Sequence, residues 1–331
     1  MTFASLGAIL PVPMKSRILP ALLALLATGT LAAHAERADS PAPVPAKKVL
    51  FFTKSSGYEH SVIRDPSLPF KPSPGSEVSG LAFQVLKAIG AKENIDFVFS
   101  KDGSLFTPAY LARFDAYFFF TTGDLTQVGN DGNPPMSPGG KAAFLQAIAD
   151  GKGFIGTHAA TDTFHTAGSM DHGDERYHND GERADPYIKM IGGEFVIHGS
   201  QQPSHLIVAD AAFPGAAGVS PDARFKEEWY SMKNFAPDMH VVLVQDTSGM
   251  VGNPYARPNY PSTWARMYGK GRVFYTNMGH RDDVWNSALF QSVLTGGVNW
   301  ALGRVDADVS PNLATAAPGA SKLPPPEPPK K

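Results

Sequence analysis

Short, wholly apolar segments alternate with helical patterns in the first half of the chain, and this alternation constrains the fold more than any other feature. The apolar segments are 48–53 (KVLFFT), 95–99, 116–121 (AYFFFT) and 153–157. Because they have no polar face, we expect strands that are buried on both sides, as in parallel sheets covered by helices. The sequence therefore predicts an α/β fold with a mostly parallel central sheet.

Helical patterns lie between and after these strands. They cover 77–89, 137–150, 185–191 and 287–302. Gly90 follows the first of them and is interpreted as its stop, because glycine commonly ends a helix. Between the last two patterns the chain predicts further strands, including a hairpin in which 262–268 and 272–277 flank Gly269-Lys270-Gly271.

The N-terminal residues 1–35 are predicted to be a secretory signal peptide. Lys15 and Arg17 precede a short apolar run, and Ala33-His34-Ala35 has the small-x-small pattern of a cleavage site. We expect translation to begin at Met14. An uncleaved membrane anchor is the alternative, and the shortness of the apolar run disfavours it. Cleavage would leave a periplasmic or secreted bacterial protein with no membrane association.

Proline-rich segments bracket one predicted domain. Residues 36–46 (ERADSPAPVPA) form a Pro/Ala linker, and residues 306–331 end in SKLPPPEPPKK. Such low-complexity composition cannot build a core, so we expect 306–331 to be a disordered tail. The domain then spans 47–305, and no internal repeat divides it.

The composition excludes several classes of function. The chain has no cysteine, which removes disulfides, thiolate metal sites and cysteine nucleophiles. Its 29 Lys and Arg nearly balance its 31 Asp and Glu, so it has no global attraction for nucleic acid. Neither a Gly-x-x-x-x-Gly-Lys loop nor a Gly-x-Gly-x-x-Gly after the first strand is present, so no nucleotide cofactor is indicated.

Histidines follow three of the predicted strands. His60 comes after the first strand, His158 directly after 153–157, and His280 after the hairpin strand 272–277. An isolated histidine at a strand end is more often a capping group than a catalytic one. The carboxyl ends of parallel strands meet at one edge of the sheet, however, where α/β proteins bind ligands. We therefore expect these three histidines to lie around one cleft.

Carboxylates and aromatic residues supply further candidates. In Glu227-Glu228-Trp229-Tyr230, a carboxylate buried beside aromatic rings would suit acid–base catalysis, and two surface charges are the equal alternative. Aromatic faces also suit sugar rings. The loop 164–185 is rich in His and Asp, but its spacing matches no zinc motif. A divalent metal there is the lesser alternative to a loop that covers the substrate.

Taken in order, these motifs resemble the ThuA-like (trehalose-utilization) family of the class I glutamine-amidotransferase-like superfamily. They are 57–60 (GYEH), 156–162 (GTHAATD), 191–195 (IGGEF) with His198, 227–230 (EEWY), Pro261-x-x-Trp264, 271–275 (GRVFY), Gly279-His280 and 300–303 (WALG). The similarity extends over about 48–304. It implies a flavodoxin-like three-layer α/β/α sandwich. Since His158 stands where the amidotransferases have their cysteine, glutaminase activity is excluded.

The resemblance also implies handling of disaccharides or their 3-keto forms. We therefore expect an exported enzyme that hydrolyses, eliminates or isomerises a (keto-)disaccharide by His/Glu acid–base catalysis, with a small-molecule sugar as its partner. A non-catalytic periplasmic carbohydrate-binding protein is the alternative, and a metal-dependent hydrolase a third.

The expected site residues fall into two groups, and no metal ligand is assigned. The catalytic candidates are His158, Glu228 and His280. The substrate-binding candidates are His60, Tyr58, Asp162, Trp264, Tyr230 and His198. Replacement of His165 or His240 by alanine is expected to cost little activity.

Overall fold

The computed structural model describes residues 46–64, 80–130, 132–170 and 174–326. The predicted signal peptide, the linker up to residue 45 and the last part of the predicted tail lie outside these residues. Predictions about those segments therefore stay predictions.

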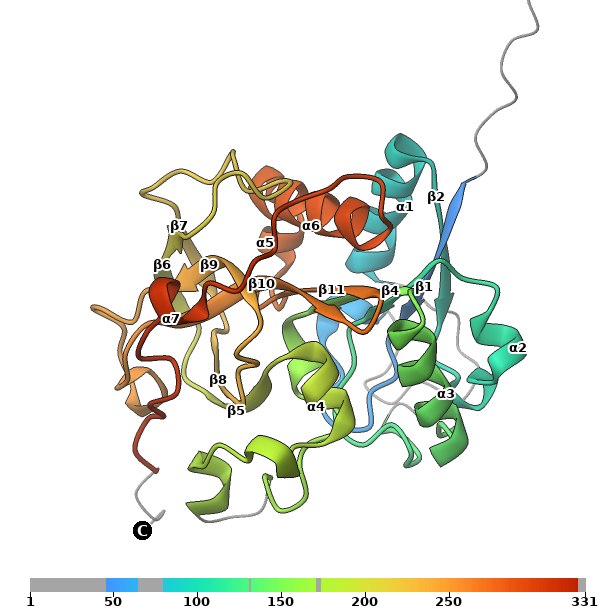
Figure 1. The fold of residues 1–331 in the computed structure, drawn as a ribbon, viewed down its shortest axis with the longest axis horizontal. Coiled ribbons are helices and arrows are strands. Elements are labelled where there is room, and N and C mark those ends of the chain that lie inside the picture. The colour runs from blue at the N-terminus through green and yellow to red at the C-terminus, as the bar shows by residue number, and fades with distance from the viewer. Residues whose placement is uncertain (1–45, 65–79, 131, 171–173, 327–331) are drawn as a thin grey trace, which may run out of the picture. The chain divides into compact units, whose positions relative to one another are not determined.

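Five parallel strands form one half of a nine-stranded sheet, in the order β2–β1–β3–β4–β11 (Figure 1). They are β1 (Lys47–Phe52), β2 (Ile95–Ser100), β3 (Ala116–Phe119), β4 (Gly153–Thr157) and β11 (Gly271–Thr276). The four apolar segments of the first half of the chain are thus adjacent parallel strands, as predicted. Their apolar sequences follow from burial on both faces of the sheet.

Antiparallel strands form the other half of the sheet, in the order β11–β10–β9–β6–β7. They are β10 (Tyr260–Tyr268), β9 (His240–Gln245), β6 (Gln202–Val208) and β7 (Arg224–Glu227). β10 and β11 form the predicted hairpin. A separate two-stranded sheet pairs β5 (Glu194–His198) with β8 (Tyr230–Lys233). The sheet is therefore mixed, with its parallel strands confined to one half.

Helices cover both faces of the sheet (Figure 1). One face carries α1 (Leu81–Glu93), α5 (Asp282–Trp285) and α6 (Ala288–Ala301), and the other carries α2 (Pro108–Leu111), α3 (Pro138–Ala149) and α4 (Pro186–Ile191). Alternate residues of a strand enter different cores: Phe51 packs in the core under α1 and α6, and Phe52 in the core over α3. The fold is thus the predicted three-layer α/β/α arrangement.

Gly90 does not end α1, contrary to our interpretation. The helix continues to Glu93 and ends at Asn94, which adopts a left-handed conformation with φ 52°. A Cβ atom on Gly90 would lie 2.5 Å from the carbonyl oxygen of Ile95. Glycine is therefore required at this position by the close packing of the helix on β2 and not by a turn of the chain.

The described part of the predicted tail is ordered and packs on the domain, so the expectation of a disordered tail is wrong for residues 306–326. This segment contains α7 (Leu313–Ala316). The side chain of Asn312 accepts a hydrogen bond from the backbone N–H of Val241 in β9 and donates one to its carbonyl, at 2.6 and 3.0 Å. Ala317 and Ala320 are buried. The composition did not predict this packing, because small side chains and polar contacts form it.

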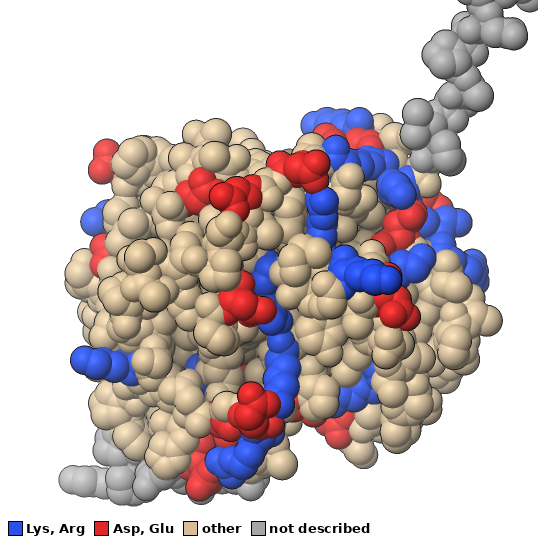
Figure 2. Space-filling model, viewed as in Figure 1, with Lys and Arg blue, Asp and Glu red and all other residues tan. Residues whose placement is uncertain are grey.

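Two observations concern membrane-spanning helices and surface charge. No helix among the described residues is both long and apolar enough to cross a membrane. On the face shown in Figure 2, Lys and Arg side chains are interspersed with Asp and Glu and form no broad basic patch among the described residues.

Candidate active site

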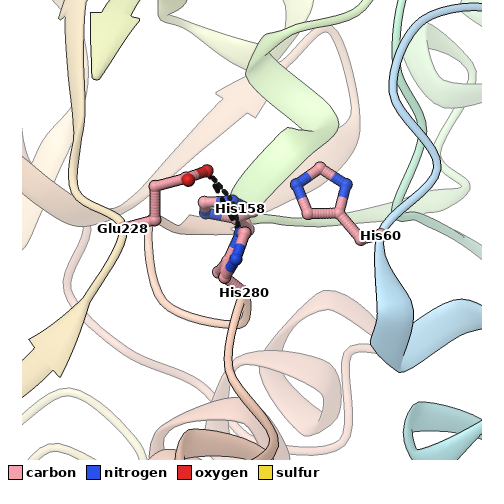
Figure 3. A group of neighbouring side chains, drawn as sticks. All are labelled: His60, His158, Glu228 and His280. Carbon is pink, nitrogen blue, oxygen red and sulfur yellow. Dashed lines mark hydrogen bonds and ion pairs between the residues drawn. The ribbon is translucent and has the colours of Figure 1, made fainter. Parts of the chain in front are cut away.

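Three histidines meet at the carboxyl edge of the parallel strands (Figure 3). His60 lies in the loop after β1, His158 directly follows β4, and His280 lies in the loop after β11. The ring of His60 lies 5.0 Å from that of His158 and 5.1 Å from that of His280, and the last two rings are 5.2 Å apart. The convergence expected from the strand-end rule is thus present.

Glu228 completes this group and comes from the segment that joins β7 to β8. Its Oε2 lies 3.1 Å from Nδ1 of His280 and 3.6 Å from Nε2 of His158 (Figure 3). Burial alone would raise the pKa of Glu228, but hydrogen bonds and charge from the two histidines hold it well below its usual range. Glu228 is therefore a carboxylate at neutral pH. We call His60, His158, Glu228 and His280 the histidine–glutamate cluster.

The backbone at His158 is held in an uncommon conformation. Its φ is 43°, in the left-handed region, and the Tyr275 hydroxyl donates a hydrogen bond to its carbonyl at 2.7 Å. Such backbone strain costs about 1–3 kcal/mol and concentrates at functional sites. Nδ1 of His158 lies 3.2 Å from the carbonyl oxygen of Asn277, which can only accept. In the neutral ring the proton is therefore on Nδ1, and the lone pair of Nε2 faces the cluster.

His60 has the least polar surroundings of the cluster. Its side chain is buried, and its ring lies 5.2 Å from that of Phe120. Burial, and then the charges of His158 and His280, lower its pKa well below the usual value, so its ring is neutral at pH 7. Its Nδ1 has no hydrogen-bond partner within the described residues.

Glu227 positions two members of the cluster, a role that the sequence did not reveal. It is fully buried, and its Oε2 accepts hydrogen bonds from the backbone N–H groups of Gly279 and His280, at 2.9 and 3.1 Å. Its Oε1 accepts from the N–H of Glu228. Gly279 has φ 129°, and a Cβ atom there would lie 2.7 Å from Oγ1 of Thr157. The sequence suggested one buried carboxylate in this pair without identifying which.

Gln201 contacts the cluster from outside, and no sequence signal singled it out. Its Nε2 donates to Nε2 of His280 at 2.9 Å, and its Oε1 accepts from Arg281 at 2.6 Å. Gln201 lies in the turn between β5 and β6. Its glycine- and serine-containing surroundings predicted only a turn.

Three of the predicted substrate-binding residues lie around the cluster. Tyr58 is 56% exposed, and its ring meets that of His60 edge-on at 4.9 Å. His198 is partly exposed, and its Nδ1 lies 3.6 Å from Oε1 of Glu228. Tyr230 packs against His158 with ring centroids 4.1 Å apart, but it is buried, so its ring supports His158 and offers no open face to a sugar.

Trp264 does not lie in the cleft, and its expected role as a stacking surface is wrong. The side chain is fully buried, its ring packs 4.3 Å from that of Tyr275, and its Nε1 donates to the carbonyl of Ile191. β10 directs this residue into the core beside α4, where it is covered on all sides. The sequence identified an aromatic residue near the site but not the face of the strand to which it belongs.

Asp162, the remaining candidate, binds a histidine outside the cluster. His165 lies between two carboxylates: its Nε2 is 2.7 Å from Asp162 and its Nδ1 is 3.2 Å from Glu194. Burial would lower the pKa of His165, but these two hydrogen bonds raise it to about 9. The expectation that replacing His165 costs little activity stays a prediction, whereas its buried ionic contacts predict a cost in stability. We call His165, Asp162 and Glu194 the His165 bridge.

A cavity of about 620 Å³ lies beside these residues. Its lining includes Tyr58, Lys141, Asp162, Phe164 and His165. Tyr58 lines this cavity and its ring contacts that of His60, so it links the cavity to the histidine–glutamate cluster, whose four residues do not themselves line the cavity. Its size and mixed lining are those of a small-molecule pocket.

The histidine–glutamate cluster is also the group of side chains best placed to hold a metal ion. Each member offers one ligand atom, and the four atoms lie within 4.8 Å of one another. The described part of the loop 164–185 contains no comparable group. Any metal site in the described chain is therefore expected at the strand ends and not in the His/Asp-rich loop.

The fold and this cluster define an α/β protein with a candidate ligand site at the carboxyl edge of its parallel strands. A family model described as ThuA, trehalose utilisation, matches residues 48–301, and the chain belongs to this family. No curated protein matches the chain.

Two solved structures of ThuA-like proteins share the fold. The protein from Bacteroides uniformis ATCC 8492 is 18% identical, with a TM-score of 0.54 over 79% of this chain and 94% of its own. The protein from Parabacteroides merdae ATCC 43184 is also 18% identical, with a TM-score of 0.50 over 82% of this chain and 96% of its own. At these identities the similarity shows the fold alone.

Proposed function

We propose that the chain is an exported sugar-processing enzyme whose catalytic centre is the histidine–glutamate cluster. The observation that carries this proposal is the meeting of three histidines and one carboxylate, from four separate segments, at the strand edge where α/β enzymes bind ligands. The family's description, trehalose utilisation, supports a sugar as the substrate. The reaction is the hydrolysis, elimination or isomerisation of a (keto-)disaccharide.

Proton transfer is the chemistry for which the cluster is equipped. The lone pair of His158 Nε2 and the carboxylate of Glu228 are two bases that face the same space. On a keto-sugar, the lone pair of His158 Nε2 would remove the proton from the carbon next to the carbonyl, and the C–H electron pair would pass into an enolate. Glu228, whose lowered pKa makes it the weaker base, would stabilise the imidazolium that forms. His280, whose Nδ1 donates toward Glu228, would stabilise the enolate oxygen.

The cavity beside the cluster is the proposed sugar site. Tyr58 presents an exposed ring between the cavity and His60, which suits stacking against the C–H face of a sugar. Asp162, which lines the cavity, would bind one hydroxyl group there, and His198, which lies beside Glu228, would bind another near the cluster. An exported protein would meet such a sugar outside the cytoplasm, consistent with the predicted signal peptide.

A screen of disaccharides and their 3-keto derivatives with the purified protein tests this proposal. We expect turnover of at least one keto-sugar by the natural protein. His158→Ala should keep binding and lose turnover, whereas His178→Ala, which changes an exposed histidine outside the cluster, should keep both. Binding without turnover in every variant, the natural protein included, would identify a carbohydrate-binding protein instead.

Export is tested separately. Cleavage after Ala35 predicts a mature protein that begins at Glu36. N-terminal sequencing of the protein recovered outside the cytoplasm gives the start directly. Recovery of exported protein with residues before 30 intact would contradict the cleavage site.

A further inference from the structure

We propose that His60, His158, Glu228 and His280 together bind one divalent transition-metal ion. This inference deepens the proposed function, on which it rests only for the chemistry that the ion would serve, since binding is measured without a substrate.

The spacing of three ligand atoms is already that of a metal site. Oε2 of Glu228 lies 3.1 Å from Nδ1 of His280 and 3.6 Å from Nε2 of His158, and the two nitrogens are 3.3 Å apart. Ligands held about 2.0–2.1 Å from a tetrahedral zinc ion are roughly 3.3–3.4 Å from one another. One ion at the centre of this triangle would therefore reach all three atoms with little movement.

His60 supplies the fourth ligand from the opposite side of the site. Figure 3 shows its ring facing the other three side chains from the loop after β1. Its ligand atom lies within 4.8 Å of theirs, so a small shift of this ring closes the coordination sphere.

The ligand types select the class of ion. Three imidazoles and one carboxylate suit zinc, manganese, iron, cobalt and nickel ions, whereas calcium and magnesium prefer sites made of oxygen atoms. The cluster is also largely buried, with His60 and His158 almost inaccessible to solvent.

The surroundings of two ligands are those of a prepared metal site. A metal-binding histidine usually donates its other ring N–H to a backbone carbonyl or a carboxylate, which fixes the tautomer. Nδ1 of His158 makes this contact with the carbonyl of Asn277, and the lone pair of Nε2 is left for the ion. Glu227 holds the backbone N–H groups of both Glu228 and His280, and so fixes the positions of two ligands at once.

Binding of the ion requires one local rearrangement, at Gln201. Coordination by Nδ1 of His280 leaves the ring proton on Nε2, where the Gln201 amide now donates. The amide must rotate so that its oxygen accepts from His280, and it then loses its contact with Arg281. Gln201→Glu supplies an acceptor in either orientation and should therefore strengthen binding.

The bound ion would supply two kinds of catalysis to the proposed enzyme. It would polarise a carbonyl or hydroxyl oxygen of the sugar, and it would lower the pKa of a bound water so that hydroxide forms near neutral pH. With the ion bound, the lone pair of His158 Nε2 would hold the ion and would no longer take the substrate proton directly. The four ligands would then act through the ion, and their replacement would abolish metal binding and turnover together.

The test is metal binding by the whole protein, purified without a polyhistidine tag and stripped with a chelator. Calorimetric titration with Zn²⁺, Mn²⁺ and Co²⁺ should show one ion per chain, and the visible absorption of bound Co²⁺ should report nitrogen ligands. We expect His60→Ala and His158→Ala to weaken binding at least tenfold. Gln201→Glu should strengthen it, and His178→Ala should leave it unchanged.

Absence of stoichiometric binding to the folded natural protein would overturn the metal site, as would binding that survives both His60→Ala and His158→Ala. Turnover measured in parallel separates this inference from the proposed function. Turnover that persists in metal-free protein overturns the catalytic role of the ion and leaves the proposed enzyme standing. A bound ion without turnover of any keto-sugar supports the metal site and counts against the enzyme.

Discussion

The molecule contains two groups of histidines and carboxylates, and they differ in the balance of donors and acceptors. In the His165 bridge, one imidazole lies between two carboxylates, and each ring nitrogen has its own partner. In the histidine–glutamate cluster, three imidazoles share one carboxylate, and Nδ1 of His60 has no partner among the described residues. The same residue types therefore form a complete network in one place and an incomplete one in the other.

The complete network holds the chain in place. Glu194 at the start of β5 also accepts hydrogen bonds from the backbone and hydroxyl of Thr166 and from Asn234. Those contacts tie the loop after His158 to β5 and leave neither nitrogen of the His165 ring free for a metal ion. A high density of His and Asp in sequence is thus a poor guide to a metal or catalytic site. The number of unsatisfied ring nitrogens distinguishes the two groups.

The largest effect is expected at the histidine–glutamate cluster. His158→Ala and Glu228→Gln should each lower kcat by roughly 10²–10⁴-fold, the usual loss when a group that moves a proton is removed. The melting temperature should change little, because the surrounding strands and Glu227 remain. Steady-state kinetics on a turned-over keto-sugar, with thermal unfolding of the same samples, measures both. Activity within tenfold of the natural protein would place the catalytic centre elsewhere.

The opposite pattern is expected at the His165 bridge. His165→Leu leaves the buried carboxylate of Glu194 without its cation, and breaking a buried ion pair in this way costs about 3–5 kcal/mol of stability. The double variant His165→Leu/Glu194→Gln should recover part of that loss, because it removes the uncompensated charge. Urea unfolding of the natural protein, the single variants His165→Leu and Glu194→Gln, and the double variant gives the comparison. A loss below about 1 kcal/mol would show that the bridge is not a stabilising network.

The two groups should also differ in how pH affects stability. The pKa of His165 is raised from 6.5 to about 9, so its contribution is complete below pH 6.5 and is lost as the pH rises through 9. Hydrogen bonds and charge from His165 overcome the effect of burial and lower the pKa of Glu194 from 4.5 to about 2, so its contribution is complete above pH 4.5 and is lost as the pH falls through 2. The bridge therefore stabilises the fold most between pH 4.5 and 6.5.

The measurement is urea unfolding at pH 5.5, 8 and 10. For His165 alone the shift corresponds to a decrease on the order of 3 kcal/mol between the first and last of these. His165→Leu should remove most of this decrease, since leucine does not titrate. If the free energy of unfolding fell equally with pH in the natural protein and in His165→Leu, the pH dependence would come from other groups.

The smallest effect is expected at the rim of the cluster. Tyr58→Ala should raise KM about 2–10-fold, the range that corresponds to a stacking energy of about 0.5–1.5 kcal/mol, and should leave stability unchanged because the ring is exposed. Trp264→Phe is the matched control: it should lower stability, since it leaves the Ile191 carbonyl without its donor, and should leave KM unchanged. If Trp264→Phe raised KM and Tyr58→Ala lowered stability instead, Trp264 would belong to the sugar site.

The sequence predicted the parallel half of the sheet and the histidines at its edge, because apolar strands and the strand-end rule are both local patterns. The place of Glu228 beside His158 could not be derived in this way. Glu228 follows a short antiparallel strand, and its position depends on how the far half of the sheet folds back. The same reason explains the error at Trp264, since a buried and an exposed aromatic residue in a strand look alike without knowledge of its neighbours.

Asn312 has a consequence for any shortened version of this protein. Its side chain occupies the two backbone groups of Val241, where an adjoining strand would otherwise pair with β9. Truncation at residue 305, the boundary that composition suggests, would uncover this stretch of strand edge, and uncovered edges recruit strands from other molecules. The shortened protein would then keep its catalytic groups and still be lost to concentration-dependent aggregation, which expression trials would easily mistake for misfolding.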